Sequence, residues 1–244
     1  MRGVIIAAGD GGRLRPYAGR TPKVLLHFRN RPLIWYPIHA MALAGIKDIG
    51  VVVGHQASDV IESLMSWRSL GVRFEFINNP EFDGGNGVSV RAARQFVGTD
   101  QFVLSMGDHV FDPDVVSRVV STRSSLPMLT VDSMASTGDQ LVDATKVFVD
   151  RDGYLIQIGK QLNHWNAVDI GVFRFQLSVF DAFDLLYERH GSELELTWVM
   201  RHLVDQPHGV TTHDINGLLW SDIDTEEDYY RAGELFGLAA DRDG

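Results

Sequence analysis

Short apolar runs alternate with helix-like stretches through the first half of the chain, and this alternation limits the fold more than any other feature. Four runs have the length and apolar character of buried strands: residues 4–8, 49–53, 72–77 and 102–105. Three stretches between them have helical spacing: residues 33–44, 58–70 and 88–96. Strands that alternate with helices in this way predict a mostly parallel sheet with helices packed on its faces.

The second half of the chain departs from this pattern. Residues 146–149 and 154–158 flank the turn signal Asp150-Arg151-Asp152-Gly153, which predicts a hairpin. The other expected elements are a strand at 168–175, helices at 178–189 and 196–204, and a last helix opened by Thr225 with Asp228. A chain of 244 residues suits one domain. We therefore predict a single α/β domain over residues 1–244, a three-layer α/β/α sandwich with a mixed, mostly parallel sheet.

Composition excludes several classes of protein. The chain has no cysteine, so disulfides, a thiolate nucleophile and a cysteine metal site are excluded. Its net charge of −10 argues against a broad nucleic-acid face. No apolar run approaches the roughly 18 residues of a membrane helix, and residues 4–8 are too short for a signal sequence. We expect a cytoplasmic protein with small-molecule partners and with neither a nucleic-acid nor a membrane partner.

A glycine-rich loop follows the first predicted strand. Gly9, Gly11 and Gly12 would let backbone N–H groups approach phosphates closely, and Arg13 and Lys23 supply two cations for a triphosphate. Nucleotidyl transfer depends mainly on positioning and charge neutralisation, which these groups provide. The spacing matches neither the phosphate-binding loop of P-loop ATPases nor the dinucleotide fingerprint. The alternative is a tight turn with surface cations, but the combination favours phosphate binding.

Four motifs lie in and just after this loop: Ala7-Ala8-Gly9, Arg13-Leu14, Pro16 and Pro22-Lys23. Together they resemble the signature of the sugar-1-phosphate nucleotidyltransferases. The resemblance implies a Rossmann-like nucleotidyltransferase fold and a nucleoside triphosphate held by Ala7, Ala8, Gly9, Gly11 and Gly12. It also implies that Arg13 and Lys23 are catalytic. Gly12 departs from the family, which usually has Thr or Ser there, so a hydroxyl contact to phosphate is missing or replaced by a backbone N–H.

Two aspartates are candidates for a magnesium site. Asp108 follows the fourth predicted strand, where α/β folds bind ligands, and Asp222 lies in a late segment. The resemblance implies that these two hold Mg²⁺ between them, and Mg²⁺ prefers one or two carboxylates plus phosphate oxygens. Asp224 either assists or caps the last helix. We leave His109 out of the catalytic set because the attacking phosphate is already an anion and needs no general base.

The segment Gly84-Gly85-Asn86-Gly87-Val88-Ser89 precedes a helix and is predicted to face the nucleotide base. Its glycines would permit close approach to a flat base, and Asn86 or Ser89 could hydrogen-bond the base edge. The resemblance assigns this region to base and ribose recognition, so Asn86, Gly87 and Ser89 are predicted nucleotide-binding residues. The alternative is a flexible loop at the start of a helix.

The acceptor side is predicted between residues 143 and 171. Lys160 could pair with the acceptor phosphate, Asp169 could accept hydrogen bonds from ring hydroxyls, and the N–H of Gly171 is expected to be accessible. Lys146 is either a second phosphate ligand or a surface residue on a strand. We predict Lys160 as catalytic and Lys146, Asp169 and Gly171 as acceptor-binding.

Four short segments narrow the resemblance further, and the last two of them differ from the pattern of many sugar-specific members: Gly85-Asn86-Gly87, Gly107-Asp108-His109, Gly159-Lys160-Gln161 and Val168-Asp169-Ile170-Gly171. All four resemble the CTP:inositol-1-phosphate cytidylyltransferases. This implies Mg²⁺-dependent transfer of a cytidylyl group from CTP to inositol 1-phosphate, or a related cyclitol phosphate, giving CDP-inositol and pyrophosphate. The base and the acceptor stay open: a hexose-1-phosphate nucleotidyltransferase and a phosphocholine cytidylyltransferase are the alternatives within the class.

A non-catalytic nucleotide-binding regulatory subunit on the same fold is the alternative from another class. Arg13, Lys23, Asp108 and Asp222 together argue against it, because a protein that only binds has no need of all four. A glycosyltransferase would normally carry an Asp-x-Asp motif after the fourth strand, and Asp108-His109-Val110 lacks it. The oligomeric state stays open, a homo-oligomer included.

Overall fold

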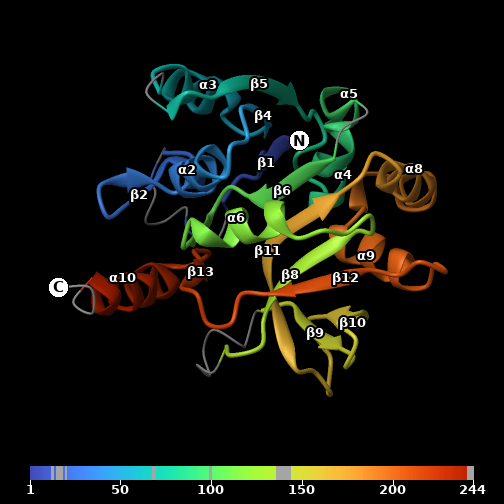
Figure 1. The fold of residues 1–244 in the computed structure, drawn as a ribbon. Helices are drawn as coiled ribbons and strands as arrows, with labels where there is room; N and C mark the ends of the chain where they lie inside the picture. The colour runs from blue at the N-terminus through green and yellow to red at the C-terminus, as the bar shows by residue number, and fades with distance from the viewer. Residues whose placement is uncertain are drawn as a thin grey trace.

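A nine-stranded mixed sheet forms the centre of the computed structural model, which describes residues 1–11, 14, 19, 21–67, 70–98, 101–135 and 144–240, with side chains to 237 (Figure 1). Its main order is β10-β9-β11-β6-β1-β4-β5, and β8 joins β11 to β12. The strands are β1 (Arg2–Ala7), β4 (Asp48–Val53), β5 (Arg73–Asn78), β6 (Phe102–Met106), β8 (Met128–Asp132), β9 (Lys146–Val149), β10 (Leu155–Gly159), β11 (Ala167–Phe175) and β12 (Thr211–Asp214).

The four strands predicted from the first half form one parallel unit. β1 pairs with β4 and β6, and β4 pairs with β5, all in parallel. Five consecutive residues of β4 are fully covered, which explains why the strand has an uninterrupted apolar sequence. Strands of this kind are covered on both faces, so nearly every position is apolar. The predicted strands are confirmed, with boundaries shifted by one or two residues.

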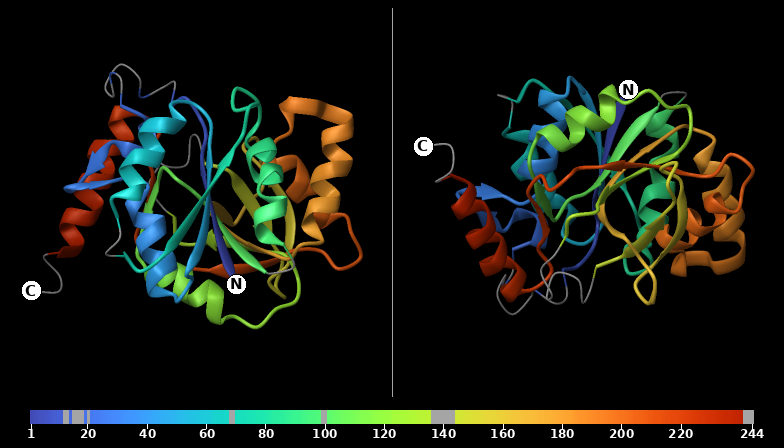
Figure 2. Two further views of the ribbon diagram at one scale, coloured as in Figure 1. Left: turned by 90° about the horizontal axis from the view of Figure 1, so that it is seen from above. Right: turned by 60° about the horizontal axis from the view of Figure 1, so that its bottom comes forward.

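Helices cover both faces of the sheet, as the view from above shows (Figure 2). On one face lie α2 (Trp35–Leu43), α3 (Ala57–Met65) and α6 (Asp114–Ser121). On the other lie α4 (Asn86–Ala92), α5 (Arg94–Val97), α8 (Val179–His190) and α9 (Leu196–Val204), with the short 3-10 helix η3 (Gly191–Glu193) between the last two. The three-layer α/β/α sandwich is confirmed.

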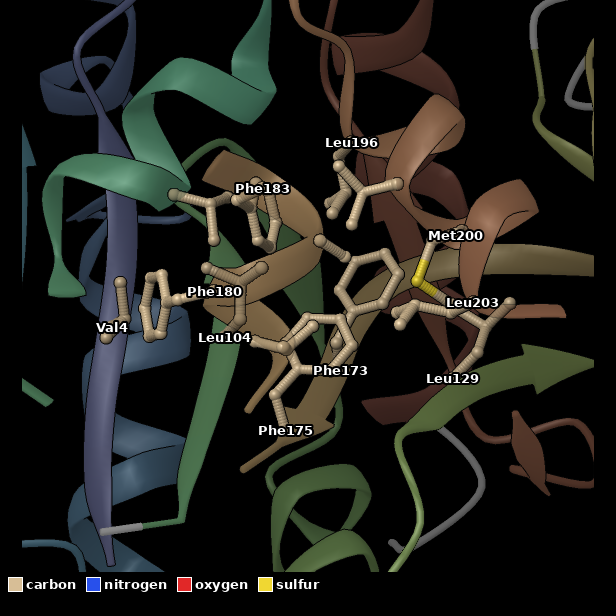
Figure 3. Close-up of a cluster of buried hydrophobic side chains, with 14 of the residues drawn as sticks. Val4, Leu104, Leu129, Phe173, Phe175, Phe180, Phe183, Leu196, Met200 and Leu203 are labelled. Atoms are coloured by element: carbon tan, nitrogen blue, oxygen red, sulfur yellow. The ribbon is translucent and has the colours of Figure 1, made fainter. Parts of the chain in front are cut away.

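Each face has its own core, and aromatic rings dominate the one beneath α8 and α9 (Figure 3). Phe180 stacks on Phe102 with ring centroids 5.5 Å apart. Phe173 and Phe175 of β11 stack in the same cluster at 5.6 Å. Burying rings of this size contributes most of the stabilisation in such a core, with about 0.5–1.5 kcal/mol more from each ring pair.

The antiparallel half of the sheet is formed mainly by the second half of the chain, where strands and helices no longer alternate regularly. β11 runs antiparallel to β6, β8 and β9, and β9 and β10 form the predicted hairpin. Asp150 shapes its turn, because Oδ1 accepts hydrogen bonds from the backbone N–H groups of Asp152 and Tyr154 at 2.9 and 2.8 Å. Asp is favoured in turns for this reason. The sheet is therefore mixed, as predicted.

The last helix closes the fold against the N-terminal region. α10 (Glu226–Ala240) begins with the predicted capping box, because Asp228 Oδ2 accepts from the N–H of Thr225 at 2.8 Å and Thr225 Oγ1 accepts in return at 3.2 Å. Its Tyr229 and Phe236 pack edge-on against Phe28. Phe28 belongs to a small hairpin of β2 (His27–Phe28) and β3 (Arg31–Pro32). Across the described ranges, no helix is both long and apolar enough to cross a bilayer.

Candidate active site

One cleft of about 810 Å³ lies over the carboxyl ends of β1 and β6. The strand order reverses between these two neighbours, because β4 and β5 follow on one side of β1 and β6 lies on the other. Such a reversal is the usual ligand site of an open α/β sheet. The cleft brings together most of the predicted site residues, which line it from seven separate parts of the chain: Ala7, Gly9, Gly11, Lys23, Asn86, Ser89, Asp108, Lys160, Asp169, Gly171 and Asp222.

Three predicted residues lie outside this lining. Ala8 is buried behind the loop, and its carbonyl accepts a hydrogen bond from the N–H of His55 at 2.9 Å. Gly87 is also buried, and Lys146 extends its ammonium group to the carbonyl oxygen of Lys160 at 3.4 Å. Lys146 therefore supports the turn that carries Lys160. The remaining predicted residues, Gly12 and Arg13, lie outside the described residues.

Lys23 is the central cation of the described part of the cleft. It opens the 3-10 helix η1 (Lys23–Leu25), directly after Pro22, and its stem packs beside Gly11. Its Nζ donates to Asp108 Oδ2 at 2.6 Å and to Asp224 Oδ1, from positions 85 and 201 residues away. Only 9% of the side chain is exposed. A charge-assisted contact of this kind holds both carboxylates close to the glycine-rich loop.

A second, two-stranded sheet brings Asp108 and Asp222 together. β7 (His109–Phe111) pairs antiparallel with β13 (Trp220–Asp222), and His109 lies directly opposite Asp222. Paired residues of an antiparallel ladder have side chains on the same face, about 4.5–5.5 Å apart at Cβ. The Ile223 N–H also donates to the Asp108 carbonyl at 3.3 Å. The second predicted carboxylate is thus placed beside the first by strand pairing.

Asp224 contributes its side chain to the cleft, because its carboxylate accepts from Lys23 while Thr225 and Asp228 form the cap of α10. The cap alternative for the Asp224 side chain is therefore wrong, and assistance at the metal site stays a prediction.

The charges in the cleft shift one another's protonation equilibria. Burial raises the pKa of Asp108, but the Lys23 charge and the His109 hydrogen bond outweigh burial and hold that pKa far below its usual range. Burial lowers the pKa of Lys23, and the Asp108 and Asp224 carboxylates more than offset it, so the ammonium stays charged. Burial raises the pKa of Asp222, and the charges of Asp224, Asp228 and Asp108 raise it further against the opposing effect of His109. The ionised form of Asp222 is therefore disfavoured, first by burial and then by the neighbouring carboxylates.

Asp169 and Gly171 lie across the cleft on β11. Burial raises the pKa of Asp169 to about 6, against the opposing hydrogen bond from Gly171. That bond joins the Gly171 N–H to Asp169 Oδ1 at 2.7 Å, so the N–H expected to be accessible is already used within the chain. Gly171 has φ +74, and a Cβ there would lie 2.6 Å from the His109 ring. A glycine is therefore required at this position by both backbone and packing.

The glycine-rich segment before α4 is packed against another part of the chain. Gly85 N–H donates to the Ser192 carbonyl at 2.8 Å, and Gly87 N–H donates to the Leu194 carbonyl at 2.9 Å. Asn86 Oδ1 accepts from the Leu196 N–H at 2.8 Å, which anchors the start of α9. The glycines therefore serve the close approach of two backbones, an explanation that the sequence alone did not supply.

The cleft also contains residues that sequence reasoning missed. Arg201 on α9 donates from Nε to the Ile158 carbonyl at 2.8 Å and lies over Gly159, beside Lys160. Trp198, one turn earlier on α9, lines the same wall. No local motif marks these positions, because helical spacing alone does not tell which polar residues of α9 meet a distant hairpin. Their role follows from the packing of α9 on β10.

The sequence profile of the MobA-like NTP transferase domain matches residues 3–141, more than half of the chain. The chain belongs to this family. The matched range includes the glycine-rich loop, Lys23 and Asp108, and it confirms the nucleotidyltransferase resemblance read from those residues. The family match therefore covers the glycine-rich loop, whereas Lys160, Asp169 and Asp222 of the cleft lie beyond the matched range.

Several proteins are similar to this chain along nearly its whole length. The low-salt glycan biosynthesis nucleotidyltransferase of Haloferax volcanii is 32% identical, covering 96% of this chain and 66% of its own. The bifunctional IPC transferase and DIPP synthase of Thermococcus kodakarensis is also 32% identical, covering 96% of this chain and 50% of its own. This chain therefore spans about half to two thirds of the length of these curated relatives. The solved inositol-1-phosphate CTP transferase from T. maritima superimposes with a TM-score of 0.83 at 27% identity, covering 96% and 94% of the two chains.

Proposed function

We propose that this MobA-like chain transfers a cytidylyl group from CTP to inositol 1-phosphate or a related cyclitol phosphate, with release of pyrophosphate. The observation that carries the proposal is a single cleft lined both by the loop, Lys23 and Asp108 and by Lys160 and Asp169. The first set suits a nucleoside triphosphate, and the second suits a phosphorylated polyol. Two relatives support the acceptor, since one is named an IPC transferase and the other an inositol-1-phosphate CTP transferase.

The nucleotide would lie over the loop from Ala7 to Gly12. Backbone N–H groups of this loop would bind the phosphates, and Arg13 and Lys23 would neutralise their charge. Asn86, Gly87 and Ser89 would support the base and ribose. Asn86 already uses Oδ1 for the Leu196 N–H, so its contribution to the base would come from the amide N–H₂.

The donor set fits one magnesium ion. Asp108 and Asp222 both line the cleft, and burial together with the neighbouring carboxylates raises the pKa of Asp222, so a cation would relieve the cost of its charge at this place. Among the described residues, no three acidic or histidine side chains form a closed metal site. Mg²⁺ commonly takes one or two carboxylates and completes its shell with substrate phosphates and water, as this arrangement allows. When bound, the ion would offset the negative charge of the triphosphate.

The acceptor would lie between β10, β11 and α9. Lys160 and the neighbouring Arg201 present two positive groups to its phosphate, and a planar guanidinium suits phosphate well. Asp169 would accept hydrogen bonds from ring hydroxyls. A polyol phosphate is therefore matched by cations at one end and a carboxylate at the other.

In the proposed reaction an oxygen of the acceptor phosphate attacks the α-phosphorus of CTP in line. A new P–O bond forms there, and the bond from the α-phosphorus to the bridging oxygen breaks, so that this oxygen leaves on pyrophosphate. The attacking oxygen is already anionic, and no base is needed. Lys23 and Arg13 would stabilise the charge that develops on the leaving group, and Lys160 would hold the acceptor in line.

A different phosphorylated acceptor is the second candidate. The Haloferax relative is named for glycan biosynthesis and is as similar in sequence as the Thermococcus relative. Its name favours a sugar phosphate, and a sugar phosphate offers the same hydroxyls and phosphate to Asp169 and Lys160.

A substrate panel tests the proposal and separates the candidates. Purified protein with Mg²⁺ would be given each of the common NTPs with inositol 1-phosphate, glucose 1-phosphate or phosphocholine, and pyrophosphate release would be measured. We expect release with CTP and inositol 1-phosphate. Release only with a hexose phosphate or phosphocholine would keep the reaction and overturn the acceptor. Nucleotide binding by calorimetry without release from any pair would favour a regulatory subunit.

A further inference from the structure

His109 lies between the aspartates of the cleft and strand β11, although the proposed reaction gives it no role. It follows Asp108 directly, faces Asp222 across the β7–β13 pair, and lines the cleft. Its side chain is only 15% exposed. A histidine in such a place either fills space or fixes the groups around it, and its contacts decide between these readings.

The first contact fixes one oxygen of Asp108. His109 Nδ1 lies 2.9 Å from Asp108 Oδ1, and because a carboxylate can only accept, Nδ1 carries the proton. Lys23 takes the other oxygen, Oδ2, at 2.6 Å. Asp108 is thus held in one rotation, with Oδ1 turned to His109 and Oδ2 turned to the ammonium group that a metal ion would have to replace.

The second contact is with β11, the strand that carries Asp169 and Gly171. The His109 ring lies so close over Gly171 that a Cβ on that residue would be 2.6 Å from both Nε2 and Cδ2. The Gly171 N–H in turn holds Asp169 Oδ1 at 2.7 Å. The histidine ring is therefore braced by β11 on the side away from Asp108.

We propose that His109 is a positioning residue that presents Oδ2 of Asp108 to the metal ion, a role that rests on the proposed function. Hydrogen-bond partners of metal ligands orient them, and losing such a partner typically costs about 10- to 100-fold in metal affinity or activity. A residue that only fills space would not require the Nδ1–H donor. The donor and the bulk of the ring can be separated by substitution.

Two variants make that separation. H109N places an amide N–H₂ near the position of Nδ1 and keeps the donor to Asp108, while H109L keeps apolar bulk and removes the donor. H109A gives a second donor-free side chain if H109L does not fold. H208L, at an exposed histidine, is the matched control. Thermal unfolding checks the fold of each variant.

Metal binding is read directly and independently of turnover. Mn²⁺ would be titrated into each protein with bound CTP, and free Mn²⁺ would be followed by electron paramagnetic resonance. We expect H109L to weaken Mn²⁺ binding by about 10-fold or more and H109N to remain within about threefold of the parent. The Mg²⁺ concentration for half-maximal pyrophosphate release should shift in the same order, with little change in the KM for the acceptor.

The result that overturns the inference is equal Mn²⁺ affinity in folded H109L and the parent, or equal losses in H109L and H109N. Failure of the proposed function is distinguishable, because it would appear as no pyrophosphate release from the parent protein while the Mn²⁺ titrations still rank the variants.

Discussion

Replacing Lys23 by methionine removes the positive charge at the centre of the carboxylate cluster and keeps most of the side-chain volume. In the parent protein Nζ is 2.6 Å from Asp108 Oδ2, also contacts Asp224, and belongs to a side chain that is 9% exposed. Two unit charges about 4 Å apart interact by about 4 kcal/mol at an effective dielectric constant of about 20. That is an upper value for one charge contact, because removing water from both groups opposes it.

The loss should appear in turnover. Removing one preorganised group that stabilises developing charge costs about 10²–10³-fold in kcat, or about 2.7–4 kcal/mol, and this transition-state effect is separate from the ground-state contact with Asp108. We expect K23M to lower kcat for pyrophosphate release by this factor. The comparison is K47M, which removes an exposed lysine and should leave kcat near the parent value.

Metal affinity should change in the opposite direction. In the nucleotide-free protein Lys23 occupies Oδ2 of Asp108, so a divalent ion must displace its ammonium group. Without that competitor, K23M should bind Mn²⁺ in the absence of nucleotide at least about tenfold more tightly, a difference of about 1.4 kcal/mol. Near-normal kcat, or weaker Mn²⁺ binding by a folded variant, would refute the assignment of Lys23.

Three further predictions concern groups away from the chemistry. R174M should lower the free energy of unfolding in urea by about 2 kcal/mol or more, because Arg174 donates to three backbone carbonyls in the last turn of α6 and just after it, and each acceptor left unpaired costs about 1–3 kcal/mol. A loss under about 0.5 kcal/mol would contradict this, with R151M as the exposed control. T225A should cost about 1 kcal/mol, and T225S should restore it, since the α10 cap needs only the hydroxyl. Burial, with a smaller effect of Arg118, lowers the pKa of His213 below its ordinary value of about 6.5. The unfolded chain therefore takes up this proton first, so His213 reduces stability as the pH falls below that value and has no effect well above it. A proton NMR titration showing a His213 pKa at or above the ordinary value would contradict that cause.

The parallel half of the sheet was predictable because strands covered on both faces have continuous apolar sequences. The run in β4 carries its own signal, and so does the helix that follows each such strand. β12 does not: its Thr211–Asp214 sequence is polar and half-buried, and it is a strand only because it pairs with β8. β7 and β13 are three residues each and define one another. Short strands specified by a distant partner leave no local pattern to read.

The candidate site likewise has residues that the sequence predicts and residues that only the structure locates. The loop after β1 and the aspartate after β6 were predictable, because the carboxyl ends of parallel strands meet at one edge. The contact of Lys23 with Asp224 spans 201 residues and depends on α10 packing against the β2–β3 hairpin, which no local pattern encodes. Arg201 was missed for the same reason. Lys160 was predicted from its chemistry and does line the cleft, whereas Arg201 beside it was located only by the structure.

Phosphorus NMR of a reaction mixture tests the central claim most directly, because it reports which bond has formed. The protein would be incubated with CTP, Mg²⁺ and inositol 1-phosphate, with K23M as the matched control. The account predicts loss of the acceptor monoester signal, appearance of pyrophosphate, and a new pair of mutually coupled signals from the two phosphorus atoms of a diphosphate diester, all much slower with K23M. An unchanged monoester signal, with this or any other phosphorylated acceptor, would contradict nucleotidyl transfer by this chain.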